Sequence, residues 1–526
     1  MPFSSASGKD FIKWVVGRVP HGKMLDVGCG SGTYAKMFTS DWTGVEIWRP
    51  YVEKYDLAKL YNTLVIDDVR TYEPSEHYDV AIAGDVLEHM TPEEAQTVVS
   101  RLKTHADTLI VSIPIGHYPQ DEYEGNPYEK HVKDDWTDAD VRMLFGEPTK
   151  AIIDNEIGVY VWSKHDLSLR VAVYAISKNE EQFVERFCKS AEKANCILIA
   201  DTGSTDGTAE KARECGAQVH DICITPWRFD LARNASVALI PRDIDVCISL
   251  DLDEVLEPGW LEELNRVWIP GKTTRLRYFF DWSCGIKFRS EKIHSRHGYF
   301  WHHPCHEYPV VDGRVNQVWA ITDMLMVTHH PDPAKSRGQY LDILELSIKE
   351  DPNCPRNAFY YARELTFYSR WEDAIVALKK YLGMAEATWP HERCFAYRLL
   401  GKSYEELHRF YEAEQHYYRA CAEAPDTREP WCALAMFYYK RSRWSDCLSA
   451  ATRAVQINHR ELVYTSDPEV WGAQPHDLLA ISAWHMGMRD LAVEQGQLAV
   501  EKNPSDLRLR SNLAHYKAPA AQEDAA

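Results

Sequence analysis

Two acidic motifs, each placed directly after a short apolar run, constrain the fold of this chain more than any other feature. Residues 196–200 are apolar, and the turn-rich sequence Asp-Thr-Gly-Ser-Thr-Asp-Gly-Thr follows at 201–208. Residues 246–248 are likewise apolar, and Ser-Leu-Asp-Leu-Asp-Glu follows at 249–254. Short apolar runs that end in turn residues are typical of buried strands in an α/β sheet. We therefore predict that Asp201, Asp251 and Asp253 lie at strand ends, where such sheets bind their ligands.

The spacing of Asp251 and Asp253 predicts a site for a divalent cation. Two carboxylates two positions apart offer hard oxygen ligands to Mg²⁺ or Mn²⁺ and leave coordination positions free for a diphosphate. The chain carries a net charge of -20, so an anionic ligand would be repelled by these aspartates. At about 4 Å the repulsion between two like charges is several kcal/mol at a near-surface dielectric, and a divalent cation reverses its sign.

With Tyr-Ala-Ile-Ser-Lys-Asn-Glu-Glu at residues 174–181, these motifs occur in an order that resembles the nucleotide-sugar domain of family 2 glycosyltransferases. We assign residues 167–335 to this α/β domain of the GT-A fold. The resemblance implies a nucleotide-sugar donor bound by Asn179, Glu180, Asp201, Arg233 and Asp251, with Arg233 near a phosphate. It implies a metal ion held by Asp251 and Asp253, with Asp253 also contributing to catalysis.

A later segment, residues 294–307, is rich in histidine. In GT-A enzymes a late histidine commonly supplies a third metal ligand, and the resemblance places His306 in that role. Glu307 beside it is the candidate base that deprotonates an acceptor hydroxyl or thiol. Five histidines in one segment are also compatible with a separate zinc site. The absence of close cysteine pairs weighs against that alternative.

The beginning of the chain carries a second ligand-binding pattern. Lys-Met-Leu-Asp-Val-Gly-Cys-Gly-Ser-Gly at residues 23–32 is an apolar strand that runs into a glycine loop. Gly28, Gly30 and Gly32 permit positive φ and a close approach of a ligand to the backbone. A dinucleotide-binding loop would require glycine at position 33, where the chain has Thr33. Asp26 would also repel a pyrophosphate, and it suits a ligand with a cationic amino group.

Acidic residues close the next three apolar runs, and the whole set resembles the class I methyltransferases that use S-adenosylmethionine. We assign residues 1–166 to such a Rossmann-like α/β domain. The resemblance implies that Asp26 and the three glycines line the methionine end of the cofactor. It further implies that Glu46 binds the ribose hydroxyls, that Asp68 and Val69 face the adenine, and that Asp85 lies near the methyl group.

The methyl acceptor is less evident from the sequence. Transfer to an oxygen usually needs a base near the sulfonium. His89, His117 and His131 fall in segments that follow predicted strands, where substrate loops are expected. His89 and His131 are the candidate catalytic residues, with a solvated role as the alternative for each. The polar, turn-rich stretch 119–131 suits a lid.

Residues 336–526 change to a helical period and are predicted to form an all-α tetratricopeptide solenoid. Small residues recur at the offsets expected for a 34-residue unit, among them Gly401, Ala413 and Ala420, and they are interpreted as packing positions. An additional segment, residues 462–472, precedes the last unit. Such arrays expose a concave groove that often binds a peptide or a protein partner.

Composition limits the location and partners of this multidomain chain. No run approaches the roughly 20 apolar residues that span a bilayer, and the first residues lack a signal-peptide pattern. The 13 cysteines form no Cys-x-x-Cys pair and are interpreted as reduced thiols of a cytoplasmic protein. The negative net charge makes nucleic acid an unlikely partner.

The sequence therefore predicts a bifunctional enzyme of glycan or glycoconjugate synthesis. One domain transfers a sugar with the help of Mn²⁺ or Mg²⁺, and the other transfers a methyl group from S-adenosylmethionine. The acceptor is a glycan, a peptide or a protein. A transferase domain followed by repeats also resembles the bacterial group that includes peptide S-glycosyltransferases, in which repeats would recruit the acceptor. A repeat scaffold with only one active domain is the remaining alternative.

Overall fold

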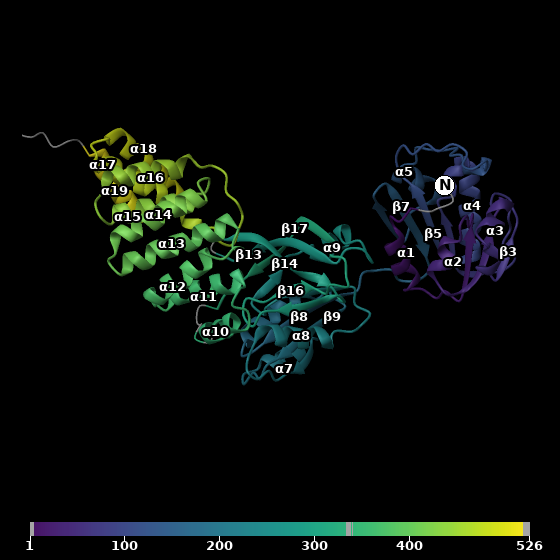
Figure 1. Ribbon diagram of the computed structural model, residues 1–526, viewed down its shortest axis with the longest axis horizontal. Coiled ribbons are helices and arrows are strands. Elements are labelled where there is room, and N and C mark those ends of the chain that lie inside the picture. Colours follow the sequence, from purple (N-terminus) through teal and green to yellow (C-terminus); the bar gives the residue numbers. More distant parts are fainter. Residues whose placement is uncertain (1–4, 284, 333–337, 339, 519–526) are drawn as a thin grey trace, which may run out of the picture. The chain divides into compact units, whose positions relative to one another are not determined.

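The computed structural model describes residues 5–283, 285–332, 338 and 340–518, and the chain forms two units. The first comprises the chain up to Arg170 together with Asn265–Thr274 and Gln317–Ala320. The second comprises Val171–Leu264, Arg275–Asn316 and the chain from Ile321 onward, so it contains both the second sheet and the helical repeats. Figure 1 shows two sheets and a helical array. No helix in the described ranges is both long enough and apolar enough to cross a membrane.

The first unit contains a seven-stranded sheet in the order β3-β2-β1-β4-β5-β7-β6. The strands are β1 (Lys23–Val27), β2 (Asp41–Val45), β3 (Thr63–Val65), β4 (Tyr78–Gly84), β5 (Ala106–Pro114), β6 (Lys150–Asp154) and β7 (Ile157–Ser163). The first five are parallel, and β7 is antiparallel to both β5 and β6. The strand order reverses between β1 and β4, so the loops after these two strands meet at the edge where α/β sheets bind ligands.

Helices cover both faces of this sheet (Figure 1). They are α1 (Lys9–Val16), α2 (Thr33–Met37), α3 (Arg49–Lys54), α4 (Pro92–His105) and α5 (Asp138–Phe145), with short 3₁₀ turns η1 (Leu57–Lys59), η2 (Leu87–His89) and η3 (Pro127–Glu129). Successive side chains of a strand point to opposite faces, so Leu25 and Val27 pack with α4 and α5 while Met24 packs with α1. The predicted Rossmann-like architecture is confirmed.

The second unit begins with an eight-stranded mixed sheet in the order β10-β9-β8-β11-β14-β13-β17-β12. Its strands are β8 (Val171–Ser177), β9 (Cys196–Asp201), β10 (Gln218–Asp221), β11 (Val246–Ser249), β12 (Glu254–Leu256), β13 (Arg275–Asp281), β14 (Lys287–Ser295) and β17 (Trp319–His329). A separate hairpin pairs β15 (Tyr299–His302) with β16 (Tyr308–Val311). The helices are α6 (Glu181–Ser190), α7 (Thr208–Glu214), α8 (Phe229–Leu239) and α9 (Trp260–Val267). As predicted, β9 ends at Asp201 and β11 ends just before Asp251.

The repeats are helix pairs: α11 (Pro355–Phe367) with α12 (Trp371–Leu382), α13 (Pro390–Glu406) with α14 (Phe410–Glu423), α15 (Arg428–Tyr439) with α16 (Trp444–Gln456), and α17 (Gln474–His485) with α18 (Arg489–Lys502). Helices α10 (Tyr340–Glu350) and α19 (Leu507–Lys517) flank the pairs, and the turn η4 (Pro468–Trp471) lies in the additional segment. The small residues act as the sequence predicted: a Cβ at Gly401 would lie 2.8 Å from the Tyr417 ring, and Ala413 and Ala420 are fully buried.

Within the second unit, one hydrophobic cluster contains residues of both the repeats and the domain built on the eight-stranded sheet. Cys305 belongs to the same cluster as Phe359 and Leu378 of the repeats, and Trp227 and Phe229 pack against it. Arg228 also forms an ion pair with Glu350 at 2.8 Å. The repeats therefore cover an apolar flank of the sheet domain and are part of its packing.

Candidate active sites

The glycine loop after β1 has the backbone that the sequence predicted. Gly28, Gly30 and Gly32 have φ values of 68°, 51° and 72°, in the region that side chains disfavour. A Cβ at Gly28 would overlap the side chain of Val86, and one at Gly32 would lie 2.6 Å from Leu60. The loop therefore packs closely against the segment after β4, and glycine is required on steric grounds.

Glu46, directly after β2, is buried and turns back to the glycine loop. Its carboxylate accepts hydrogen bonds from the backbone N–H of Gly30 at 2.9 Å and of Trp48 at 2.8 Å. Burial raises the pKa of Glu46, and these two hydrogen bonds oppose that effect. The Glu46 side chain is thus held beside the glycine loop.

Asp26 lies inside β1 and is 1% exposed. Its carboxylate accepts a 2.6 Å hydrogen bond from the Tyr61 hydroxyl, and burial raises its pKa to about 7. Lys9 and Glu46 are close enough to act on it electrostatically. A buried carboxyl group that gains from a nearby positive charge fits the expected cationic end of a methionine ligand.

Of the other three predicted cofactor residues, Asp68 and Asp85 are held by hydrogen bonds. Asp68 accepts hydrogen bonds from the Arg70 guanidinium, the shortest at 2.6 Å, and these bonds lower its pKa. Val69 beside it is partly buried against the core. Asp85 has φ 55° and accepts hydrogen bonds from Ser112 Oγ at 2.8 Å and Ser5 N at 3.2 Å. Asp85 therefore has a fixed orientation at the end of β4.

His89 and His131 lie together, whereas His117 does not join them. The ring centroids of His89 and His131 are 4.9 Å apart, and burial lowers the pKa of both imidazoles. His117 is mostly exposed and lies 3.7 Å from Asp134. Glu88, which the sequence interpretation did not select, adjoins the histidine pair, and burial raises its pKa well above the usual range. Its position next to His89 in the sequence was the available signal.

In the second unit, Asp201 organises the loop after β9. It accepts hydrogen bonds from Ser177 Oγ, Gly203 N and both the N–H and hydroxyl of Ser204. Burial would raise the pKa of Asp201, but the hydrogen bonds outweigh burial and lower it. The charged carboxylate is therefore stable at this strand end.

Asn179 and Glu180 follow the neighbouring strand β8. Asn179 has φ 55° and its side-chain carbonyl accepts a hydrogen bond from Thr205 N at 2.7 Å. Glu180 is buried, and its backbone N–H donates to Thr208 Oγ1 at 2.8 Å. These contacts bring the loops after β8 and β9 together.

Arg233 of α8 is buried and connects Asp251, a predicted metal ligand, with Glu307, the predicted base. Its guanidinium donates to Glu307 at 2.5 Å, to Ser249 Oγ at 3.0 Å and to Asp251 at 2.6 Å. Burial would lower the pKa of Arg233, but Asp251 and Glu307 raise it well above the usual value. The structure places Arg233 as a buried link between both carboxylates.

Two residues that the sequence interpretation missed complete this charge cluster. Lys292 of β14 lies 3.0 Å from Glu254 and 3.7 Å from Asp251, and Glu254 accepts a hydrogen bond from Asp251 N at 3.0 Å. Burial alone would lower the pKa of Lys292, but these carboxylates raise it. Asp251 therefore lies between two cationic side chains, the buried Arg233 and the partly buried Lys292. The sequence of β14 contains several charged and polar residues, so nothing in it singles out Lys292 as a partner of Asp251.

The histidine beside Asp253 is His329, at the end of β17, and its Nε2 lies 3.4 Å from the Asp253 carboxylate. Burial would lower the pKa of His329, but Asp253 and Glu254 raise it. His306 instead stacks on Tyr360 of the repeats with ring centroids 3.8 Å apart. The structure thus differs from the expectation of an Asp251, Asp253 and His306 cluster. Among the described residues, the ligand atoms of Asp251, Asp253 and His306 do not all lie within 4.8 Å of one another.

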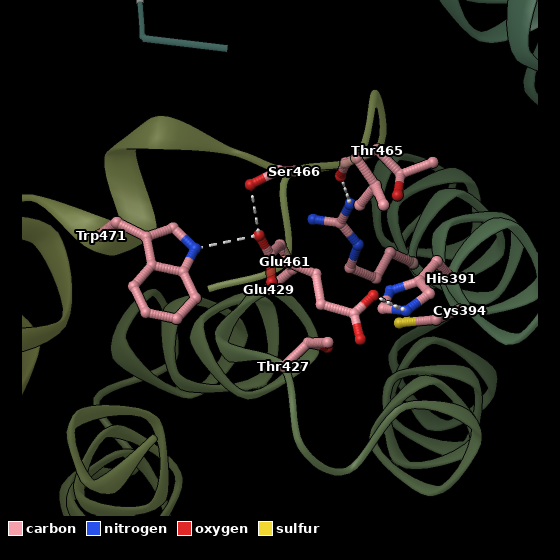
Figure 2. Close-up of a pocket in the computed structure, with 10 residues that line it drawn as sticks. His391, Cys394, Thr427, Glu429, Glu461, Thr465, Ser466 and Trp471 are labelled. Carbon is pink, nitrogen blue, oxygen red and sulfur yellow. Dashed lines mark hydrogen bonds and ion pairs between the residues drawn. The ribbon is translucent and has the colours of Figure 1, made fainter. Parts of the chain in front are cut away.

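A small pocket in the repeats is lined by residues of α13, of the start of α15 and of positions 461–471 (Figure 2). None of the predicted site residues of the two sheet domains lines it. Glu429 accepts hydrogen bonds there from Ser466 Oγ, Asp467 N and Trp471 Nε1 at 3.1–3.2 Å. Tyr464 also stacks on Tyr360. The additional segment therefore covers the face formed by α11, α13 and α15, where the sequence predicted an open groove for a peptide.

Comparisons with known proteins identify both sheet domains. Residues 25–105 match the family model described as a methyltransferase domain, and residues 173–291 match that of glycosyl transferase family 2. No curated protein matches the chain.

Solved structures that resemble the chain include YrrB, described as a TPR protein with an unusual peptide-binding site. It is 17% identical with a TM-score of 0.27, over 33% of this chain and 81% of that chain. MamA is 20% identical with a TM-score of 0.26, over 31% and 86%. PilF of Pseudomonas aeruginosa is 16% identical with a TM-score of 0.27, over 33% and 72%. The two family models identify the chain as a transferase that combines a methyltransferase domain with a family 2 glycosyl transferase domain.

Proposed function

We propose that this enzyme transfers a sugar from a nucleotide-sugar donor with the help of Mn²⁺ or Mg²⁺. The observation that carries the proposal is the contact of Asp253 with His329 at the end of β17, with Asp251 two positions before Asp253 after β11, in the sheet that also holds β8 and β9. Carboxylate oxygens with one imidazole fit Mn²⁺ or Mg²⁺. His329 replaces His306 as the third ligand in this proposal, and the ion supplies positive charge for the leaving diphosphate.

The chain's own residues position the reacting groups. Arg233 holds both Asp251 and Glu307, so the donor side and the acceptor side of the site share one rigid link. Lys292 offsets the negative charge of Asp251 and Glu254. Asn179, Glu180 and Asp201 border the nucleoside, and Glu307 is the group proposed to receive the acceptor proton.

We further propose that the first domain transfers a methyl group from S-adenosylmethionine to a glycan or its carrier. Gly28, Gly30 and Gly32 give the loop after β1 a backbone with positive φ, and Glu46 is fixed beside that loop. Asp26 serves the cationic end of the cofactor, Asp68 and Val69 the adenine, and Asp85 the methyl end. His89 and His131 activate the acceptor hydroxyl. A cytoplasmic location completes the proposal.

Recruitment of a peptide or protein acceptor by the repeats needs a surface other than the covered face. The additional segment contacts α15 there through Glu429, and Glu461, just before the segment, pairs with His391 of α13 at 2.7 Å. A glycan acceptor needs no such groove. We therefore favour a glycan or glycoconjugate as the shared acceptor of both reactions.

Donor cleavage tests the proposal directly. The purified chain should release nucleoside diphosphate from one member of a sugar-nucleotide panel when Mn²⁺ or Mg²⁺ is present. EDTA should stop the reaction, and added Mn²⁺ should restore it. Undiminished cleavage in EDTA would reject the metal role of both aspartates. S-adenosylmethionine binding, measured by calorimetry, should persist in EDTA because Glu46 and the glycine loop make no use of a metal.

A further inference from the structure

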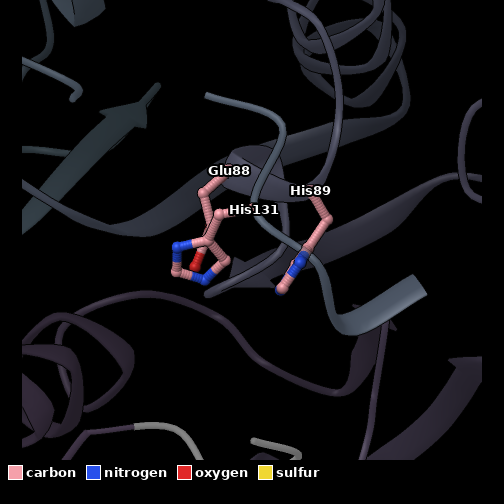
Figure 3. A group of neighbouring side chains, drawn as sticks. All are labelled: Glu88, His89 and His131. Carbon is pink, nitrogen blue, oxygen red and sulfur yellow. The ribbon is translucent and has the colours of Figure 1, made fainter. Parts of the chain in front are cut away.

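Glu88, His89 and His131 converge from two segments of the methyltransferase domain. Glu88 and His89 lie in η2, directly after β4, whereas His131 lies in the loop after η3. One donor atom from each side chain lies within 4.8 Å of the other two. Figure 3 shows the three side chains extending into the same space. Among the described residues, this is the one group of three histidine, cysteine or acidic side chains with that geometry.

The backbone holds the two segments together. Val132 N and Lys133 N donate hydrogen bonds to the carbonyl oxygen of Glu88 at 2.8 and 3.1 Å. These bonds fix the residue after His131 to the residue before His89. The relative position of the three side chains is therefore set by the fold and does not depend on contacts among the side chains themselves.

Both imidazoles are oriented for binding through Nε2. His89 Nδ1 lies 3.2 Å from the carbonyl oxygen of Lys130, and His131 Nδ1 lies 2.6 Å from that of Tyr118. A carbonyl oxygen only accepts, so each Nδ1 carries the hydrogen and each neutral ring keeps its lone pair on Nε2. A backbone carbonyl on the other ring nitrogen is the usual arrangement for a histidine that binds a metal.

The Glu88 carboxylate requires an explanation. The residue is 2% exposed, and its Oε2 is buried without a hydrogen-bond partner. A buried carboxylate oxygen in this state costs several kcal/mol unless a cation or donor satisfies it. Asp85 and Glu129 act electrostatically on Glu88 and add negative charge to its surroundings. A bound cation would satisfy the carboxylate and offset that charge.

We propose that Glu88, His89 and His131 bind a divalent first-row transition metal ion. One carboxylate oxygen and two imidazole nitrogens form a ligand set that suits Zn²⁺, Mn²⁺, Fe²⁺ or Co²⁺ better than Mg²⁺ or Ca²⁺. Three protein ligands leave coordination positions open, which is the pattern of catalytic sites. The ion of this site is distinct from the one proposed for Asp251 and Asp253.

The site lies beside the proposed cofactor site, so this inference rests on the proposed methyl transfer. Gly28 packs against Val86, two residues before Glu88. Glu129 acts electrostatically on both Glu46, the proposed ribose ligand, and Glu88, the proposed metal ligand, so both lie near the Glu129 side chain.

The acceptor class that fits this site is a hydroxyl. The ion lowers the pKa of the bound hydroxyl, whose proton passes to solvent. The oxygen then bonds to the methyl carbon as the S–CH₃ bond breaks, and S-adenosylhomocysteine leaves.

Cobalt binding to the full-length chain tests the site without any assay of activity. The chain carries Asp253→Asn to remove the other expected metal site and is first freed of metal by a chelator. Titration with Co²⁺ should give visible absorption and one bound ion per chain, and Zn²⁺ should displace it. In the same background His131→Gln should weaken Co²⁺ binding at least about 100-fold, since even an indirect ligand contact is worth 10- to 100-fold.

Two variants control for folding and for the surroundings. His117→Gln changes a histidine whose side chain is 73% exposed in the same region, and it should leave Co²⁺ affinity unchanged. Glu88→Gln should weaken Co²⁺ while S-adenosylmethionine still binds by calorimetry, which reports an intact domain. Equal Co²⁺ affinity in His131→Gln and His117→Gln would overturn the inference. Cofactor binding without any Co²⁺ binding would also overturn it and leave the proposed function standing. If the unsubstituted chain does not bind S-adenosylmethionine, the proposed methyl transfer itself is rejected.

Discussion

Arg233 joins groups that are far apart in the sequence, since Glu307 lies 74 positions away and Asp251 lies 18 positions away. Its three side-chain hydrogen bonds use one N–H from each guanidinium nitrogen. Removing Arg233 would leave the Glu307 carboxylate, whose side chain is 9% exposed, without this cation, and loss of one partner of a buried ion pair typically costs about 3–5 kcal/mol. At the residue scale the sugar-transfer site is therefore a charge network, in which each acid keeps its place through a cation.

His329 and His306 give a direct test of which histidine serves the metal. His329→Ala should weaken Mn²⁺ binding and lower the rate of sugar transfer, because its Nε2 lies beside Asp253. His306→Ala should lower the thermal unfolding temperature more than Mn²⁺ affinity, because its ring stacks on Tyr360. Metal titration and thermal unfolding of both variants make the comparison. The reverse pattern would restore His306 as the ligand.

Asp26 predicts a pH dependence of stability in the methyltransferase domain. Burial raises its folded-state pKa to about 7 from an ordinary 3.8. The folded chain then binds one proton more than the unfolded chain between these values, so the free energy of unfolding falls as pH rises through that window. The loss is on the order of 4 kcal/mol by the end of the window.

Asp26→Asn keeps an acceptor for the Tyr61 hydroxyl and removes the titration. In calorimetric scans, the unfolding transition of the methyltransferase domain is the one whose temperature increases when S-adenosylmethionine is added. Between about pH 4 and about pH 8, the temperature of this transition should depend less on pH in the variant than in the unsubstituted chain. The variant should also unfold at a higher temperature than the unsubstituted chain near pH 8 when no cofactor is added. Identical pH profiles for the two proteins would show that Asp26 titrates normally.

At the scale of elements, local patterns predicted the strand ends but not the residues that arrive from distant strands. Asp201 and Asp251 follow apolar runs that become β9 and β11, so their place at the sheet edge could be inferred from neighbours in sequence. Lys292 and His329 belong to β14 and β17, which enter the sheet antiparallel and far along the chain. Their register is decided by long-range pairing, for which the sequence offers no local signal.

The glycine loop and the repeats illustrate the same difference. Gly28 and Gly32 were predictable because their backbone requirement is local. The helix pairs were predictable because small residues recur at a fixed spacing. The position of segment 462–472 over α13 and α15 was not predictable. This segment is held there by hydrogen bonds to Glu429, which precedes it in the sequence by more than thirty positions.

The repeats should be needed for the solubility of the sheet domain that precedes them. Deletion of residues 336–526 removes the packing partners of Cys305, Trp227 and Phe229. We expect the truncated chain to aggregate, because these apolar side chains become exposed. Deletion of residues 489–526 is the matched control, since α18 and α19 lie outside that cluster. Soluble yield and gel filtration make the comparison. A monodisperse 1–335 chain with full donor cleavage would contradict the packing role.

At the scale of the whole molecule, the chain combines two sheets that each place their proposed ligands at their own strand ends. Glu46 and the glycine loop belong to the first unit, whereas Asp253 and His329 belong to the second. No residue of one proposed donor site is shared with the other. The two transfer reactions are therefore expected to be independent in donor binding, even where they act on one acceptor.

A cross of two variants of the full-length chain tests this account most directly. Glu46→Ala should weaken S-adenosylmethionine binding by about 1.5–3 kcal/mol, the scale of a charge-assisted hydrogen bond. Asp253→Ala should lower sugar transfer at least about 100-fold, since loss of an electrostatic contact to the leaving group costs about 3 kcal/mol. Both donors are measured in both variants. The account predicts that each variant loses only its own donor reaction. It is contradicted if Glu46→Ala leaves S-adenosylmethionine affinity unaltered, or if Asp253→Ala retains the full rate of sugar transfer.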